Sequence, residues 1–292
     1  MMDKRDNRPL DKSLKEYARG IAGGLLFSFP LLYTMEVWWT GFMVTPLQLI
    51  AMIVATYILL LGYNHFAGLR ADASWRTVFI DSVEEMGIGI LIAFFVLLLL
   101  NRIEWHSMAL DEIVGKTIVE GMIVSIGVSI GTAQLGGGND DDEEKERDKV
   151  NEEFWKNAGW WQRKLGLVVL ALCGSILVGG NVAPTEEVVL MAFEATPFQI
   201  LLMAVFSLVL SALIVFFSDF KGATTQGGPN SLAVNVITDT CLSYLTALGA
   251  SAVCLYFFGR FGGVNFYVAF SQCIVLGVLS SLGASAGRLL IK

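Results

Sequence analysis

The sequence predicts an all-α integral membrane protein with eight transmembrane helices, built as two tandem, parallel four-helix repeats. Of its 292 residues, 54% are hydrophobic and only 16% are charged, whereas soluble domains carry about a quarter charged residues. Runs such as 88–100 and 201–217 contain no acidic or basic residue. Backbone groups in lipid must bond within their own segment, so long apolar runs cross the bilayer as helices. The third observation is a set of matches between the two halves.

The apolar runs place the eight spans in order along the chain. We expect them at residues 20–39, 46–67, 78–101, 112–133, 165–193, 197–217, 233–258 and 264–290. The fifth contains Pro184 soon after two glycines. Proline removes a backbone donor and clashes with the preceding turn. We therefore expect a broken or kinked helix there.

The lysines and arginines predict the orientation. Only Arg102, Lys116 and Arg260 fall on one side of the predicted membrane, and all the others fall on the opposite side. Cytoplasmic loops carry the excess of basic residues. The basic N-terminus leads into the first span without a nearby small-residue cleavage site, as in an uncleaved signal anchor. We therefore expect a multi-pass protein of the bacterial inner membrane with both termini in the cytoplasm.

Composition divides the chain into four parts. They are a cytoplasmic tail (1–19), a first repeat (20–135), a cytoplasmic acidic linker with an interfacial helix (136–164) and a second repeat (165–292). The linker begins with glycines and continues as a mixed charge run, which is typical of flexible segments. Three tryptophans interleaved with basic residues within 154–164 predict a short helix at the headgroup level, leading into the fifth span.

The repeat is predicted by matches in serial order. Thr45–Met52 and Thr196–Met203 share Thr, Pro, Gln and Met at the same positions. Further pairs follow at nearly the same offset: Glu36 with Glu187, Asp81 with Asp239, Arg102 with Arg260, and Ser125, Gly127, Ser129 and Gly131 with Ser281, Gly283, Ser285 and Gly287. With four spans each, both repeats begin on the same side. We expect a pseudo-twofold axis along the membrane normal.

Each repeat ends in a span with a GxxxG motif. The pairs are Gly127 with Gly131 and Gly283 with Gly287. Small residues at this spacing let helix backbones approach closely. We expect the fourth and eighth spans to pack tightly, either against each other at the axis or against another neighbour.

Two segments carry a family resemblance. Residues 28–39 read SFPLLYTMEVWW and residues 181–189 read NVAPTEEVV. With these motifs the chain resembles an uncharacterised family of bacterial integral membrane proteins of similar length. The resemblance implies a membrane location and no particular activity. NVAPTEE is also similar to the Pro-Glu signature of cation exchangers, but the parallel repeat argues against that fold.

Acidic residues inside the spans are candidates for function, because a charge at the bilayer centre costs about 2.5–3.5 kcal/mol on insertion scales. Glu36, Glu186 and Glu187 lie near the outer ends of the first and fifth spans, close to prolines. Carboxylates and carbonyls freed at a broken helix are ligands for hard cations. The three glutamates could form an outward-facing cation or proton site, or could be interfacial carboxylates that cap helices.

Other acids lie along the predicted spans. Asp81, Glu84 and Glu85 share a helix face near the cytoplasmic end of the third span, and only Asp81 has an acidic counterpart, Asp239. They could relay protons or be a solvated helix start. Glu120 is deepest, and Lys116 four residues earlier could form an ion pair with it. A functional role and a structural buried pair both remain open for Glu120.

Other chemistry finds little support. His65 and His106 are expected near opposite membrane surfaces, where they cannot share a metal, and the four cysteines are expected to be buried small hydrophobes. No HExxH motif, phosphate loop or Ser-His-Asp set is present, so we expect neither an enzyme nor a cofactor. No basic patch predicts nucleic-acid binding.

Two functional hypotheses follow. The first is a transporter or channel for a small cation, which could be proton-coupled, with Glu36, Glu186 and Glu187 at its outer mouth and Asp81, Asp239 and Glu120 along its path. The second is a non-transporting scaffold or sensor in the lipid bilayer whose acidic linker binds a partner. A homo-oligomer is compatible with either.

Overall fold

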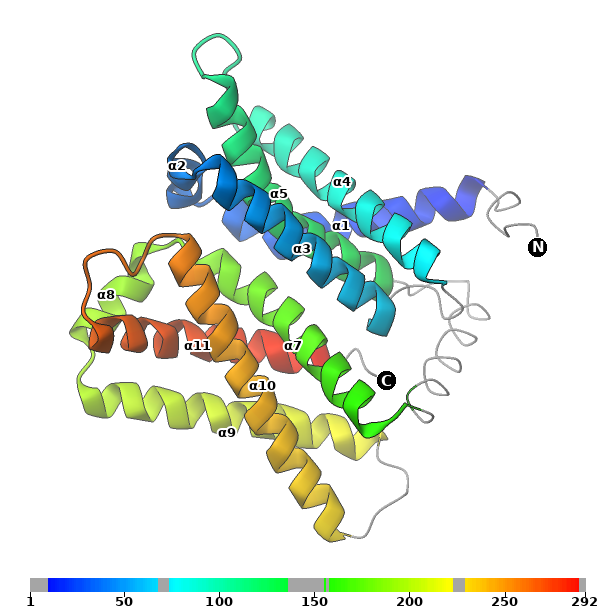
Figure 1. Cartoon of the computed structure of the whole chain (residues 1–292), viewed down its shortest axis with the longest axis vertical. Coiled ribbons are helices and arrows are strands. Elements are labelled where there is room, and N and C mark those ends of the chain that lie inside the picture. The colour runs from blue at the N-terminus through cyan, green and yellow to red at the C-terminus, as the bar shows by residue number, and fades with distance from the viewer. Residues whose placement is uncertain (1–9, 68–73, 136–154, 156–157, 223–228, 289–292) are drawn as a thin grey trace.

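The computed structural model describes residues 10–67, 74–135, 155, 158–222 and 229–288, in which ten helices form a bundle (Figure 1). The first five are α1 (Leu10–Leu32), α2 (Met35–Met43), α3 (Pro46–Ala67), α4 (Trp75–Leu99) and α5 (Leu110–Gln134). The second five are α7 (Trp160–Val182), α8 (Glu186–Glu194), α9 (Pro197–Gly222), α10 (Pro229–Phe257) and α11 (Phe266–Arg288). The predicted linker at 136–153 lies outside the described residues.

The all-helical membrane fold predicted from the sequence is confirmed. Seven of the helices are long and apolar enough to cross a membrane, and the pair α1–α2 makes an eighth span if it counts as one. The helices α3 and α9 expose most of their apolar side chains, since only 17% of the apolar window of each is buried. In α5, 89% of the apolar window is buried. Thus α5 is the most enclosed helix and the others shield it from lipid.

The predicted first span, 20–39, is wrong as a continuous helix. The helix α1 ends at Leu32, and α2 leaves it at an angle of 87°. Pro30 lies in the last turn of α1, where it removes a backbone donor. Thr34 before α2 is extended, with φ −89° and ψ 115°. The chain therefore turns sharply at the predicted outer surface.

The predicted break in the fifth span is confirmed. The helix α7 ends at Val182, before Pro184, and α8 begins at Glu186. Like α2, α8 has nine residues. The second five helices therefore follow the order of the first five: one long, one short and three long.

The interfacial helix predicted before the fifth span lies partly outside the described residues, because 154, 156 and 157 are not described. Trp155 is helical, and Trp160 and Trp161 form the exposed first turn of α7. Gly159 N donates to Gln162 Oε1 at 3.1 Å, which starts α7 at this point. The interfacial helix as a whole stays a prediction.

Helix directions agree between the two halves. In the first half Gly20 lies against Thr132 and Ser28 against Gly127, so α1 and α5 are antiparallel. In the second half Leu170 lies against Gly287 and Gly179 against Ser280, which makes α7 and α11 antiparallel too. The start of α1 and the end of α11 lie on the same side of the bundle (Figure 1).

The GxxxG motifs meet the first helix of their own half rather than each other. A methyl group on Gly131 would lie 2.4 Å from Gly23 Cα, and one on Gly283 would lie 2.2 Å from Gly174 O. The two backbones therefore touch at each crossing. Of the two alternatives predicted for the fourth and eighth spans, the structure therefore shows packing against another neighbour and not against each other, because α1 and α7 occupy their glycine faces.

Two turns have the same geometry in both halves. Thr45 N donates to Gln48 Oε1 at 2.8 Å, and Thr196 N donates to Gln199 Oε1 at 2.8 Å. After α4 and α10, the chain turns through a residue with positive φ, Asn101 at 56° and Gly259 at 69°. These are left-handed helix ends, in which the next amide bonds back five residues.

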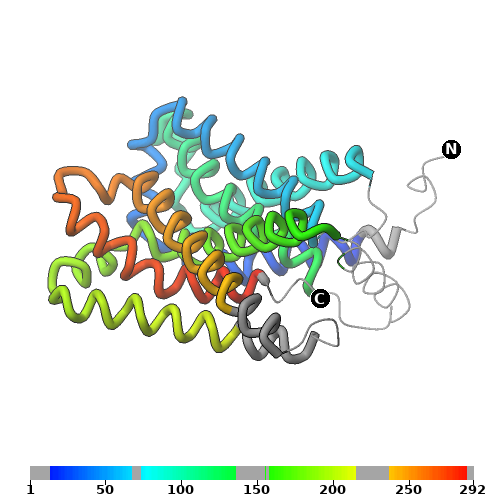
Figure 2. Tube along the Cα trace, turned by 60° about the horizontal axis from the view of Figure 1, so that its bottom comes forward, coloured from blue at the N-terminus to red at the C-terminus, as the bar shows by residue number. Residues whose placement is uncertain are grey.

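The two halves meet mainly through α7. This helix packs against α1, α3 and α5 and is seen between the two sets of helices in Figure 2. Val169 lies against Gly62, and Cys173 Sγ is 3.8 Å from Leu59 O. The main neighbours of α1, in contrast, are α4, α5 and α7. The contacts that α1 and α7 make with the other helices therefore differ.

Candidate functional site

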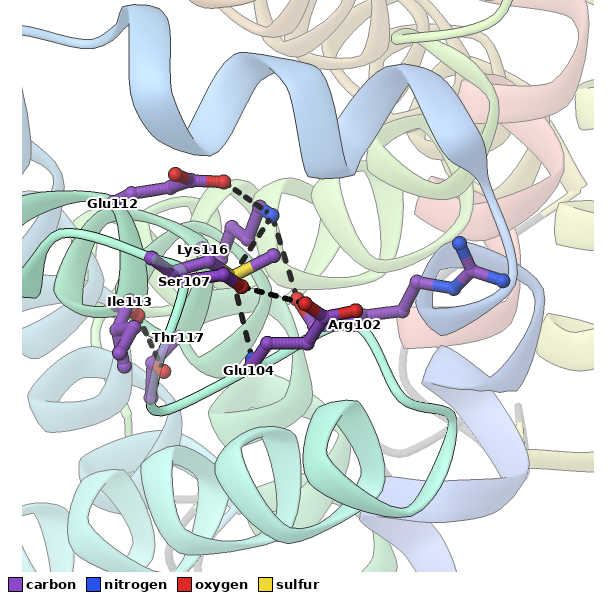
Figure 3. Close-up of polar contacts among 8 residues, drawn as sticks. Arg102, Glu104, Ser107, Glu112, Ile113, Lys116 and Thr117 are labelled. Atoms are coloured by element: carbon purple, nitrogen blue, oxygen red, sulfur yellow. Dashed lines mark hydrogen bonds and ion pairs between the residues drawn. The ribbon is translucent and has the colours of Figure 1, made fainter.

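A polar cluster closes the N-terminal end of α5 (Figure 3). Lys116 Nζ lies 2.7 Å from Glu112 Oε1, 3.4 Å from Arg102 O and 3.7 Å from Met108 Sδ. The Lys116 side chain is only 6% exposed. Helical side chains lean toward the N-terminus of their helix, so Lys116 reaches back to Glu112. The predicted ion pair between Lys116 and Glu120 is therefore wrong.

The loop between α4 and α5 covers this cluster. Arg102 extends over the ring of Trp38 from α2, with 4.2 Å between the guanidinium carbon and the ring centroid. Ser107 Oγ donates to Glu104 Oε2 at 2.5 Å (Figure 3). The loop thereby joins α2 to the start of α5 and holds Lys116 beneath it.

Replacing Lys116 by methionine should lower the free energy of unfolding by about 1.5–3 kcal/mol, the usual range for hydrogen bonds to charged groups. The change removes the ammonium that bonds Glu112 Oε1 and the Arg102 carbonyl. Denaturant titration in detergent micelles measures the effect. The control is Glu104→Gln, an exposed side chain whose amide oxygen can still accept from Ser107 Oγ, and it should change little. Equal effects of the two variants would contradict the assigned pairing.

Glu120 lies one turn beyond Lys116 and is fully buried, with 0% exposed. Neither of its carboxyl oxygens has a hydrogen-bond partner among the described residues. On α5, Gly127 lies against Ser28 of α1, and Lys116 lies against Gly41 of α2. Glu120 lies between these two contacts and therefore at the level of the α1–α2 break. An ionised carboxylate without partners is costly to bury, so this group needs a proton or a bound cation.

A second buried acid, Glu85 on α4, belongs to a hydrogen-bond network that joins three helices. Asn64 Nδ2 on α3 donates to Glu85 Oε2 at 2.7 Å and to Ser82 Oγ at 3.1 Å. Ser129 Oγ on α5 donates to Asn64 Oδ1 at 3.1 Å and lies near Glu85. The four side chains are buried. We call this set the Glu85 network.

Asp81 and Asp239 match in sequence but differ in surroundings. Asp81 lies one turn before Glu85, and it and Glu16 of α1 interact electrostatically with Glu85. Asp239 forms an ion pair with Lys164 at the start of α7, and both side chains are largely buried. The acid of the second half is therefore held by a lysine.

The other predicted glutamates lie in the first turns of the two short helices. Glu36 begins α2 and is half-buried, whereas Glu186 and Glu187 begin α8 and are exposed. Acidic residues at helix N-termini are favoured by the helix dipole. In the described residues no three or more His, Cys, Asp or Glu form a group that could hold a metal ion. That these glutamates form one shared cation site stays a prediction.

The sequence analysis did not single out Asn181, which joins the two halves. Its Oδ1 accepts from Leu31 N at 3.0 Å, and its Nδ2 donates to Phe27 O at 3.0 Å and to Leu177 O. In an unbroken helix Leu31 N would bond to Phe27 O. The amide of α7 therefore sits within the hydrogen-bond ladder of α1, next to Pro30. The repeat offset of 151 aligns Asn181 with Pro30, a signal that could have pointed to it.

Asn64, Ser82 and Ser129 were also missed as partners of Glu85. Ser129 was seen only as a packing residue. His65, for which a packing role was expected, stacks on Trp75 with 4.6 Å between ring centroids. The prediction of four buried cysteines is wrong for Cys241, which is exposed on α10.

One comparison with known proteins gives a match. The model of the family described as "Putative integral membrane protein (DUF2391)" matches residues 16–291. No curated protein and no solved structure matches the chain. The family match covers both halves and every helix above.

Proposed function

Because the chain belongs to the DUF2391 family of integral membrane proteins, we propose a function from its own buried groups: it moves a small cation or protons across the membrane. The observation that supports this most is Glu120, a carboxyl group enclosed at the level of the α1–α2 break without a hydrogen-bond partner in the described residues. Intramembrane acids of this kind mark ion and proton pathways.

The proposed path follows α5. It starts at the outer cluster of Glu112 and Lys116, passes Glu120 and reaches the Glu85 network at Ser129, with Asp81 beyond it. From residue 112 to residue 129 a helix rises about 25 Å at 1.5 Å per residue. This is most of the hydrocarbon thickness of about 30 Å. The polar groups are thus spread over the depth that an ion must cross.

We propose further that the two sets of helices are tandem copies inserted with the same polarity, with both termini in the cytoplasm of a bacterium. The matched glycine crossings, the matched turns and the common helix order support this. Under this proposal Glu36 and Glu187 occupy equivalent outer positions. They would be the outer ends of two similar routes, of which only the first contains a buried carboxyl at the position of Glu120.

The test is flux of protons, Na⁺ and K⁺ into proteoliposomes, with Glu120→Gln, Glu36→Gln and Glu187→Gln measured singly. Glu120→Gln should abolish flux, and the outer variants should reduce it by weakening local attraction for cations. Glu194→Gln, an exposed carboxylate at the end of α8, is the control and should behave as wild type. Flux that survives Glu120→Gln would refute the path, and wild type without flux of any cation would favour a scaffold.

A further inference from the structure

We infer that the Glu85 network is a proton-binding site and not a metal-cation site, so that the ion taken up there is H⁺. The part of this inference that concerns transport rests on the proposed function. The binding of the proton itself rests only on the geometry of four buried side chains from α3, α4 and α5.

The first step is that a hydrogen-bond donor points at the carboxylate. Asn64 Nδ2 donates to Glu85 Oε2 at 2.7 Å. The Ser129 hydroxyl donates its single proton to Asn64 Oδ1 and lies near Glu85. An N–H group directed at a carboxylate places partial positive charge where a metal ion would have to sit. A proton needs no such space, since it binds one carboxyl oxygen covalently.

The second step is that the amide orientation is fixed by its neighbours. Ser82 Oγ donates its proton to Val78 O at 2.8 Å, so toward Asn64 it can only accept. The Asn64 group nearest Ser82 must therefore be the NH₂, and the same NH₂ faces Glu85. Asn64 Oδ1 is consequently turned to Ser129. Turning the amide over would place two acceptors together at Ser82.

The third step is that too few oxygens remain for a metal ion. Calcium takes six to eight oxygen ligands, and Mg²⁺ takes six. Here the only amide oxygen points away from the carboxylate, and the Ser82 oxygen already accepts from Asn64. In the described residues, no three or more His, Cys, Asp or Glu form a group that could hold a metal ion. The chemistry of the network therefore fits a proton.

The charged groups around the network suit proton delivery from the predicted cytoplasmic end. They are Asp81 and the exposed Glu84 on α4, Glu16 on α1 and His65 on α3, whereas α5 has no charged residue between Glu120 and Gln134. Asp81 is one turn from Glu85 on the same face. The second half has Ser243 in place of Glu85 and an Asp239 paired with Lys164, so the site belongs to the first half alone.

Infrared difference spectroscopy of the reconstituted full chain tests the binding. A step from high to low pH should produce a protonated-carboxyl C=O band that is lost in Glu85→Gln. Ser129→Ala should retain the band but shift the pH of its half-appearance, since it removes a donor without emptying the site. The control Glu84→Gln should leave that band unchanged. If Glu85→Gln does not fold, the shift of the carboxyl band in Ser129→Ala still tests the proton site.

The outcomes separate the two proposals. A Glu85 band that is unaffected by Na⁺, K⁺ and Ca²⁺ supports the proton site, and its suppression by one of these ions would overturn the inference. Absence of any pH-dependent band assignable to Glu85 would overturn it too. A normal band in a protein that carries no ion in proteoliposomes would instead refute the proposed function and leave proton binding intact. Proton flux lost in Glu85→Gln supports both.

Discussion

Replacing Asn181 by leucine is expected to lower the free energy of unfolding by about 2–4 kcal/mol, one of the largest effects of any single substitution in the chain. Leucine has a similar size but neither donates nor accepts. The change leaves Leu31 N–H and Phe27 C=O without the amide that now bonds both. A buried polar group that loses its partner costs about 1–3 kcal/mol. Thermal unfolding of the full chain in detergent, without added ligand, measures the change.

The control is the same substitution, asparagine to leucine, at an exposed position. Asn265 Oδ1 accepts from Val268 N at 2.9 Å at the start of α11, and the residue is exposed. In Asn265→Leu, water can replace the lost bond. The expected cost is therefore about 1 kcal/mol, as for the loss of a helix cap. Asn181→Leu that is no worse than Asn265→Leu would show that the inserted amide contributes little.

A double-mutant cycle with Pro30→Ala identifies the cause. Proline at position 30 has no N–H, and its ring crowds the carbonyl four residues earlier, which keeps the last turn of α1 open for the Asn181 side chain. With alanine there, α1 can close its own ladder. Asn181→Leu should then cost less than in wild type, because Leu31 N can bond to Phe27 O. Additive effects would mean that the two residues act separately.

Long apolar runs account for how well the spans could be predicted. The bounds of α3, α5, α9 and α11 lie within a few residues of the prediction because polar or turn-forming residues flank each run. The α1–α2 break was missed because Val37, Trp38 and Trp39 keep the segment apolar across the bend. Hydropathy indicates whether a segment lies in lipid or in water, and not the direction in which it runs. An 87° turn within an apolar stretch therefore cannot be recognised from hydropathy.

The buried site was harder to predict than the spans. Asp81, Glu84 and Glu85 were seen as one crowded face, but adjacent residues in a helix point about 100° apart, and packing buries Glu85 while Glu84 remains exposed. The partners of Glu85 lie 21 residues away at Asn64 and 44 residues away at Ser129. Only the tertiary packing of α3, α4 and α5 brings them together, and a single sequence contains no direct sign of it.

Substituting Gly174 by alanine is expected to destabilise the protein by about 3 kcal/mol or more. The added methyl would lie 2.1 Å from Gly283 O, a backbone atom that cannot rotate away. The helices α7 and α11 would have to separate, and their close packing along the crossing would be lost. Overpacking costs 1–3 kcal/mol where side chains can adjust, so a clash with backbone should reach or exceed the upper value. Denaturant titration in micelles measures the shift.

Each half of the chain supplies its own matched control for this clash. Gly249 in α10 and Gly87 in α4 have open space where a methyl group would go. Alanine there should be neutral or stabilise the helix by up to about 1 kcal/mol. In the first half, the repeat offset of 151 aligns Gly23 with Gly174, and Gly23→Ala would bring its methyl 2.3 Å from Gly131 Cα. If the halves are copies, Gly23→Ala and Gly174→Ala should have similar effects. A severe effect in one half with a neutral effect in the other would argue against equivalent crossings.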